Sequence, residues 1–246
     1  MNFKSILACA ALLIGVGTAT AAVQSDVVGY TTIEVTQKYT LLGVSFFDLA
    51  DSTQDTIPVN DFISGDFADG DQIQVPKNGS TSEYDRAAWN SELGKWCTIR
   101  FNKPSTTESS IVLKKGTGVW FVSFQATEQA PVKVTLKGRA LLSATAEYDC
   151  AQKYSLVSLP IYEAVSVNAT SLIWAGLQDG DQIQVPKNGS TTEYDRAAWN
   201  SKLGKWCTIR FNKPSTTESP VMFKPYEAAW LVSTGTDASC IYDSTK

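Results

Sequence analysis

The sequence predicts an all-β protein built from two tandem, homologous, antiparallel units that resemble a β-sandwich or a barrel. The segment from Asp69 to Ser109 returns as Asp179 to Ser219, 110 residues later (179 minus 69), with only two substitutions. A repeat of this period indicates one folding unit per copy. Around it lie short β-branched and aromatic stretches separated by turn residues, which is typical of antiparallel β folds. We therefore expect units at 22–138 and 139–246.

The first 21 residues have the features of a secretory signal peptide. Lys4 precedes an apolar run from Ile6 to Val16, and small residues follow at 19–21. The run is too short to span a bilayer comfortably, and no later stretch is apolar enough to do so. We expect an exported protein without a membrane span, either secreted or held in the periplasm or at the cell surface of a bacterium.

The remaining elements follow from local composition. Strands are expected where β-branched and aromatic residues gather, at 27–35, 37–47, 111–113, 119–123 and 132–136 in the first unit. The second unit repeats most of them, at 152–162, 221–223, 229–233 and 240–242. A helical turn is expected near 60–64, a three-stranded meander in the duplicated segment, and a polar loop at 103–108.

The register of the meander is predicted from its turns. Asn-Gly is a strong signal for a two-residue hairpin turn, and centring that turn at 78–79 places Ile73 opposite Tyr84. A second turn between the next two strands pairs Trp89 with Trp96. Residues on successive positions of a strand point to opposite faces, so these pairings sort the meander into two faces.

One predicted face belongs to the core and contains Ile73, Val75, Tyr84, Ala88, Cys97, Ile99 and Phe101, with Asp71 and Arg86 as a charge pair at its margin. The opposite face combines polar side chains with a cross-strand tryptophan pair, and Asp85 lies opposite Arg100 there. Its candidate ligand or interface residues are Gln72, Gln74, Asp85, Trp89, Trp96 and Arg100, repeated as Gln182, Gln184, Asp195, Trp199, Trp206 and Arg210.

This mixed face has three interpretations. Flat aromatic rings beside amides, a carboxylate and a guanidinium suit stacking on a sugar ring, which predicts a glycan-binding protein with two equivalent sites. The same residues suit a protein interface, where Trp and Arg are enriched, and predict a non-catalytic structural or interaction protein of the cell exterior that assembles with itself. Alternatively a bulge, or coverage by another strand or loop, buries the tryptophans, as is usual for large aromatics.

Residues for catalysis are scarce. The chain has no histidine, which excludes Ser-His-Asp and Cys-His nucleophilic sites and histidine metal sites. Glycoside hydrolysis needs only two carboxylates, and Glu83 with Asp85, or Glu193 with Asp195, keeps a hydrolase as a lesser alternative. A neighbouring arginine lowers the pKa of a carboxyl, however, which opposes the general-acid role. We expect no catalytic residue.

Metals, cofactors and charged polymers are also not expected as partners. Asp66, Asp69 and Asp71 offer oxygen atoms that suit calcium, but the second unit keeps only Asp179 and Asp181, so a solvated turn is favoured. The 21 basic and 25 acidic residues give a net charge of −4 without a basic cluster. This balance argues against nucleic acid and against an anionic membrane.

Four cysteines lie beyond the signal peptide. Cys97 and Cys207 are repeat equivalents on the predicted core face, and we expect them to be buried thiols. Cys150 and Cys240 occur only in the second unit, near its first and last strands. A pair acquired together suggests a Cys150–Cys240 disulfide, although four cysteines allow three connectivities.

Four short motifs recur in order along the first unit: Val27-Val28-Gly29-Tyr30, Gly70-Asp71, Gly94-Lys95-Trp96 and the GxGxW stretch at 116–120. In this order they resemble uncharacterised secreted proteins of the Planctomycetes–Verrucomicrobia–Lentisphaerae group of bacteria. The second unit departs from the pattern, because Tyr226 to Trp230 lacks the glycines. That family has no established activity, so the resemblance implies export and an all-β build, and no particular chemistry.

Overall fold

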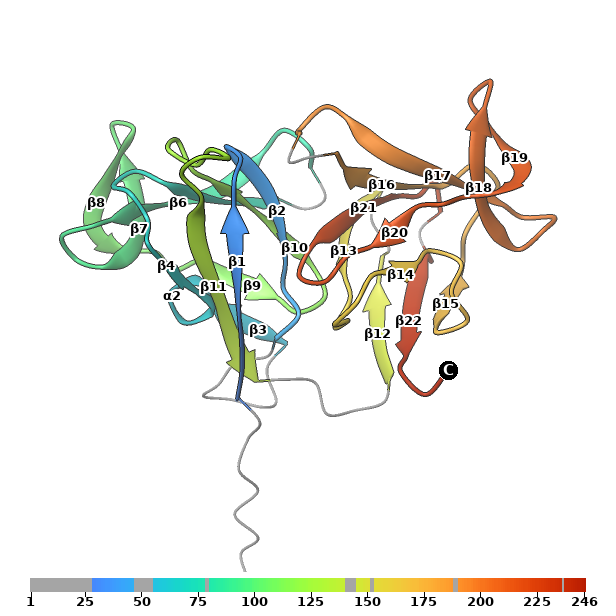
Figure 1. Ribbon diagram of the computed structural model, residues 1–246, viewed down its shortest axis with the longest axis horizontal. Coiled ribbons are helices and arrows are strands. Elements are labelled where there is room, and N and C mark those ends of the chain that lie inside the picture. Colours follow the sequence, from blue (N-terminus) through green and yellow to red (C-terminus); the bar gives the residue numbers. More distant parts are fainter. Residues whose placement is uncertain are drawn as a thin grey trace, which may run out of the picture.

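The computed structural model describes residues 28–46, 55–77, 80–139, 145–150, 153–187, 190–235 and 237–246. The expected signal peptide and both Asn-Gly pairs lie outside the described residues. Across the described ranges the chain forms strands throughout, apart from turns and the short helix α2 (Val59–Phe62). The predicted class, an all-β protein of two tandem antiparallel units, is confirmed, and Figure 1 shows the two units side by side.

The first unit contains three antiparallel sheets, with strand orders β1-β11-β4, β2-β10-β5-β6-β7-β8 and β3-β9. Their bounds are β1 (Val28–Val35), β2 (Tyr39–Gly43), β3 (Thr56–Pro58), β4 (Ile63–Gly65), β5 (Gln72–Pro76), β6 (Tyr84–Asn90), β7 (Lys95–Arg100), β8 (Lys103–Glu108), β9 (Val112–Lys114), β10 (Gly118–Val122) and β11 (Val132–Arg139). Helix α2 falls where a helical turn was expected, whereas the expected polar loop at 103–108 is strand β8.

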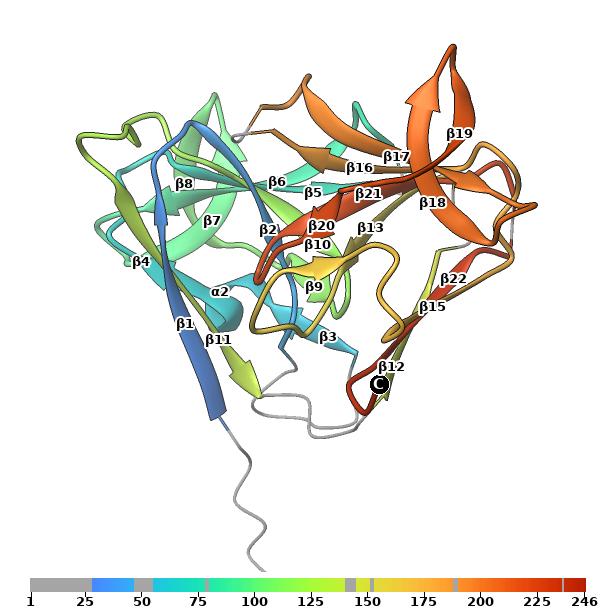
Figure 2. The same cartoon turned by 45° about the vertical axis from the view of Figure 1, so that its right-hand side comes forward.

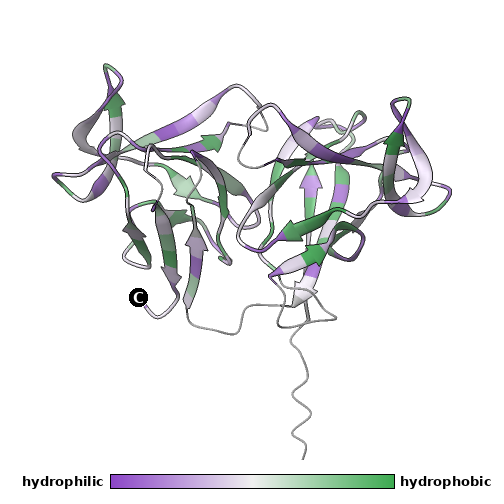
Figure 3. Cartoon of the chain, turned by 180° about the vertical axis from the view of Figure 1, so that it is seen from behind, coloured by the Kyte–Doolittle hydropathy of each residue, from purple (hydrophilic) through white to green (hydrophobic). Residues whose placement is uncertain are grey.

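The second unit repeats this plan, with strand orders β12-β22-β15, β13-β21-β16-β17-β18-β19 and β14-β20. Its strands are β12 (Thr145–Asp149), β13 (Tyr154–Ser158), β14 (Val165–Ser166), β15 (Leu172–Ala175), β16 (Gln182–Pro186), β17 (Tyr194–Asn200), β18 (Lys205–Arg210), β19 (Lys213–Glu218), β20 (Met222–Phe223), β21 (Ala228–Val232) and β22 (Ser239–Asp243). Hydrophobic and hydrophilic segments alternate along the strands of both units (Figure 3). Each unit therefore packs its own core between its sheets.

The register of the first hairpin differs from the prediction. Ile73 pairs with Ala87 and not with Tyr84, a shift of three residues. The connection runs on past the Asn-Gly pair, because the Ser80 hydroxyl accepts hydrogen bonds from the amides of Ser82 and Glu83 and folds this stretch into a longer loop. An odd shift exchanges the two faces of every later residue in the meander.

The exchange of faces puts the tryptophans inside. The predicted Trp89–Trp96 pairing is confirmed, but the pair shares the face of Ile73 and packs edge to face, with ring centroids 5.2 Å apart. Trp96 and its equivalent Trp206 are both 0% exposed. Trp89 and Trp199 are half-buried and pack against the same cores, so the predicted exposed tryptophan face is wrong in both units. Phe101, expected in the core, is instead 99% exposed.

The expected Cys150–Cys240 disulfide is not formed. Strands β12 and β22 do pair, but Tyr148 lies opposite Cys240 and the Cys150 amide donates to the Ala238 carbonyl. The two cysteines are thus diagonal and not directly opposed. All four cysteines in the described residues are buried, and no disulfide links them.

The two units are joined by a matched pair of backbone hydrogen bonds. The Gly43 amide donates to the Tyr226 carbonyl at 2.7 Å, and the Ser158 amide donates to the Gly116 carbonyl at 2.8 Å. Gly43 and Ser158 are repeat equivalents, as are Gly116 and Tyr226. The same bond is therefore made in both directions, so an approximate two-fold relation connects the units.

Small residues allow the close approach at this junction. A Cβ atom on Gly43 would collide with the Ser158 hydroxyl, and one on Gly118 would lie 2.5 Å from the Cβ atom of its equivalent, Ala228. Leu41, Trp120 and Ala228 form a small apolar cluster across the junction. The outer faces of the two six-stranded sheets thus meet near the two-fold axis.

Candidate functional site

The structure separates the residues of the predicted mixed face. Asp85 pairs with Lys77 at 3.0 Å, and Asp195 with Lys187 at 3.2 Å, so neither contacts the predicted arginine. Arg100 lies opposite Lys103 at the end of the next hairpin, as Arg210 lies opposite Lys213. These carboxylates and guanidiniums do not form one site with the buried tryptophans.

The glutamines keep their predicted place on the outer face. Gln74 donates to Gln72 at 3.0 Å, and Gln184 donates to Gln182 at the same distance. Gln74 pairs across the sheet with Trp120, which shares this outer face. Of the predicted site residues, Gln74 alone lines a pocket that lies between the two units.

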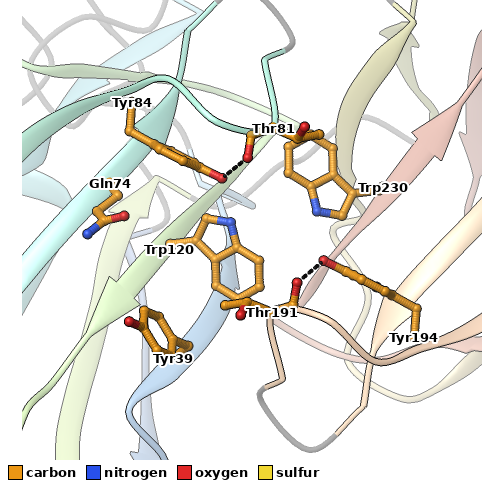
Figure 4. A pocket seen from close by; sticks show the side chains of 8 residues that line it. All are labelled: Tyr39, Gln74, Thr81, Tyr84, Trp120, Thr191, Tyr194 and Trp230. Carbon is orange, nitrogen blue, oxygen red and sulfur yellow. Dashed lines mark hydrogen bonds between the residues drawn. The ribbon is translucent and has the colours of Figure 1, made fainter.

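This inter-unit pocket has a volume of about 460 Å³, within the usual range for small-molecule sites. Figure 4 shows its lining, which consists of Tyr39, Gln74, Thr81, Tyr84, Trp120, Thr191, Tyr194 and Trp230. Five of these eight residues are aromatic, and none is charged. The pocket therefore combines flat apolar walls with neutral polar groups.

Repeat equivalents face one another across the pocket. Thr81 and Thr191, Tyr84 and Tyr194, and Trp120 and Trp230 each occupy the same position in the two units. Figure 4 shows the members of each pair on opposite sides of the cavity. The site is complete only because the two units dock, so neither unit forms it alone.

The two tyrosines are held in place by short local hydrogen bonds. The Tyr84 hydroxyl donates to the Thr81 carbonyl at 2.8 Å, and the Tyr194 hydroxyl donates to the Thr191 carbonyl at 2.8 Å. Partial burial raises the pKa of both phenols, against a lowering effect from the arginine two residues along. Both phenols are thus protonated at neutral pH, and each oxygen keeps a lone pair that can accept a further bond.

The indole nitrogens of Trp120 and Trp230 are the hydrogen-bond donors of the site. Trp120 and Trp230 are each 4% exposed, and neither indole N–H has a hydrogen-bond partner among the described residues. Figure 4 shows both indole nitrogens turned toward the space between the rings. Two donors without a protein partner therefore face the pocket, where a ligand can supply an acceptor.

These nitrogens also remain accessible. Among the described residues, only Trp206 has a side-chain nitrogen that is both sealed from solvent and without a partner. The nitrogens of Trp120 and Trp230 are not sealed in this way, so a ligand in the pocket can reach them. The site thus offers two N–H donors, two phenol acceptors and the Gln74 amide within aromatic walls.

Sequence reasoning missed the site residues because they come from two separate units. Strand β10 offered one indication of the inter-unit contact: its residues, Gly118 to Val122, are buried at every position. A strand that is apolar on both faces needs cover on both sides. One face of β10 packs on its own core, and the other unit supplies the cover for the second face.

The aspartates considered for calcium have structural roles. Asp71 is 1% exposed and accepts hydrogen bonds from the amides of Ala68 at 3.0 Å and Phe124 at 3.2 Å, so the predicted charge pair with Arg86 is not formed. Burial raises the pKa of the Asp71 carboxyl, partly offset by these bonds. No group of metal-ligating side chains occurs among the described residues.

Comparison with known proteins does not assign this chain to a family or a function. No protein-family model, curated protein or solved structure matches this chain. The resemblance to exported bacterial proteins therefore stays a prediction. Within the described residues, no helix is long and apolar enough to cross a membrane.

Proposed function

We propose that this chain is an exported, non-catalytic binding protein that holds a neutral, hydroxyl-rich ligand, a glycan, in the inter-unit pocket. The observation that carries the proposal is the pair of indole N–H donors, on the largely buried Trp120 and Trp230, that face the pocket without a partner among the described residues. Both donors can be reached from the pocket, so an acceptor on a bound ligand can take the place of water there.

The chemistry of the lining favours a sugar over other small ligands. Aromatic faces suit the C–H faces of a sugar ring, while the N–H and phenol groups suit its hydroxyls, which both accept and donate. An anionic or cationic ligand would enter without a counter-charge, because no charged side chain lines the pocket. Glycan binding was one of the functions expected from the sequence, with two equivalent sites. We propose instead a single site that both units form together.

Assembly with other copies through the duplicated tryptophan face, the other function expected from the sequence, loses its basis in the structure. The central tryptophans of that face, Trp96 and Trp206, are in the core at 0% exposure. A hydrolase is also less favoured, because Asp85 and Asp195 are held in exposed ion pairs with lysine.

The proposal is tested by calorimetric titration with neutral trisaccharides of glucose, mannose, xylose and N-acetylglucosamine. We expect one of these probes to bind with a stoichiometry of one per chain. Trp120→Phe and Trp230→Phe keep an aromatic wall but remove the N–H. Each substitution should therefore weaken binding about three- to tenfold, the value of one hydrogen bond.

Trp96→Phe is the matched control, since it removes an indole N–H that donates to the Ile63 carbonyl inside the core and cannot reach the pocket. It should leave the affinity unchanged. A stoichiometry of two per chain, or loss of binding on Trp96→Phe but not on Trp120→Phe, would contradict a composite site. The absence of binding across the whole panel would remove the glycan assignment.

A further inference from the structure

Each unit ends its six-stranded sheet in a hairpin whose tip is aromatic and cationic. We call the segments 100–103 and 210–213 the tip hairpins; both read Arg-Phe-Asn-Lys. Phe101 is 99% exposed and Phe211 is 98% exposed. The arginine and lysine on either side of each phenylalanine are exposed too, and no ion pair is found for any of these four cations in the described parts of the chain.

Local conformational preferences are violated at both tips. Phe101 and Phe211 adopt φ values of 50° and 49°, in the left-handed region that bulky side chains rarely occupy. Arg100 lies directly opposite Lys103, and Arg210 opposite Lys213, although like charges in that position destabilise a hairpin. Strained backbone conformations and like-charge pairs of this kind are concentrated at functional sites, where the surrounding structure holds them in place.

The two tip hairpins project from the same side of the molecule. Figures 1 and 2, which share a vertical axis, both show the β7–β8 and β18–β19 hairpins rising away from the edge where the C-terminus lies. Each belongs to a different unit, so the tips stand apart at the two ends of this side. Only a partner with an extended, roughly flat surface meets both at once.

We propose that the tip hairpins dock the protein on an anionic lipid surface, with Phe101 and Phe211 inserted at the headgroup level. Aromatic side chains favour the membrane interface, and cations beside them are attracted to anionic headgroups. The net charge of −4 does not oppose this locally, because exposed charges farther than about 10 Å away are largely screened by salt. Two tips also provide the two weak anchors that stable surface binding needs.

A protein partner fits these tips less well. A specific protein interface buries about 1,200–2,000 Å² of packed surface, which two isolated two-residue turns do not offer. Insertion of a side chain among headgroups requires no complementary shape. The inference does not rest on the pocket, which is lined by other residues.

The test is cosedimentation of the secreted protein with phosphatidylglycerol–phosphatidylcholine vesicles, against vesicles of phosphatidylcholine alone. We expect binding to the anionic vesicles only, weakened by added salt. The double variant Phe101→Asn/Phe211→Asn should lose roughly tenfold or more of this affinity, because both inserted rings are removed. Its melting temperature should be unchanged or higher, because Asn tolerates the left-handed conformation.

Leu93→Asn/Leu203→Asn is the matched control, since these leucines are 47% and 48% exposed on the neighbouring β6–β7 and β17–β18 turns. It should bind anionic vesicles as the unchanged protein does. Equal binding by the phenylalanine variant, or no binding of the unchanged protein to anionic vesicles, would overturn the proposal. Capture of a protein through the tips without vesicle binding would overturn it as well.

Discussion

At the residue scale, Trp96 and its repeat equivalent Trp206 have different surroundings. The indole N–H of Trp96 donates to the Ile63 carbonyl at 3.2 Å, whereas that of Trp206 is sealed without a partner. Trp206 packs against Trp174, at 5.2 Å between ring centroids, whereas Trp96 packs against Phe67 at 4.9 Å. Identical local sequence thus meets a different core, because the strands outside the duplicated segment have diverged.

This difference predicts unequal costs for the same substitution. Trp96→Phe and Trp206→Phe remove similar ring area, but only the first breaks a hydrogen bond and leaves a buried carbonyl unpaired. We expect Trp96→Phe to lower the free energy of unfolding by about 1–2 kcal/mol more than Trp206→Phe. Urea unfolding of both variants measures this, and equal losses would show that the Trp96–Ile63 bond contributes nothing.

At the scale of the elements, strands were more predictable than the register between them. The β-branched stretches and the Trp89–Trp96 pairing follow from composition and spacing, and the structure contains them. The first hairpin could not be predicted, because its loop length depends on the Ser80 hydroxyl bonding to the amides of Ser82 and Glu83. Such side-chain bonds compete with the turn that Asn-Gly alone would favour. One loop of the wrong length then exchanged both faces.

Strands β2 and β13 approach each other closely at Gly43 and Ser158. A side chain on Gly43 would collide with the Ser158 hydroxyl and approach the Glu227 carbonyl within 2.9 Å. We expect Gly43→Ser to destabilise the protein by about 1–3 kcal/mol. The double variant Gly43→Ser/Ser158→Gly exchanges the equivalent residues across the two-fold axis and should recover much of the loss. Thermal unfolding measures both, and a double variant no more stable than the single would refute this contact.

At the scale of the whole molecule, the duplication creates a site that neither copy contains. The repeat indicates two units directly, yet nothing in it predicts that Trp120 and Trp230 face each other across a pocket. That arrangement depends on small residues at the junction and on the paired bonds of Gly43 and Ser158. Among the predicted site residues only Gln74 lines the pocket, because the relative placement of two units is not encoded in local patterns.

The central claim is that the indole N–H groups of Trp120 and Trp230 bind the ligand. The most direct measurement is an NMR titration of protein carrying ¹⁵N-labelled tryptophan, which gives one indole signal for each of the seven tryptophans. With the best-binding neutral trisaccharide, we predict that the signals of Trp120 and Trp230 shift together while those of Trp96 and Trp206 stay in place. Unmoved Trp120 and Trp230 signals in the presence of a bound sugar would contradict the account.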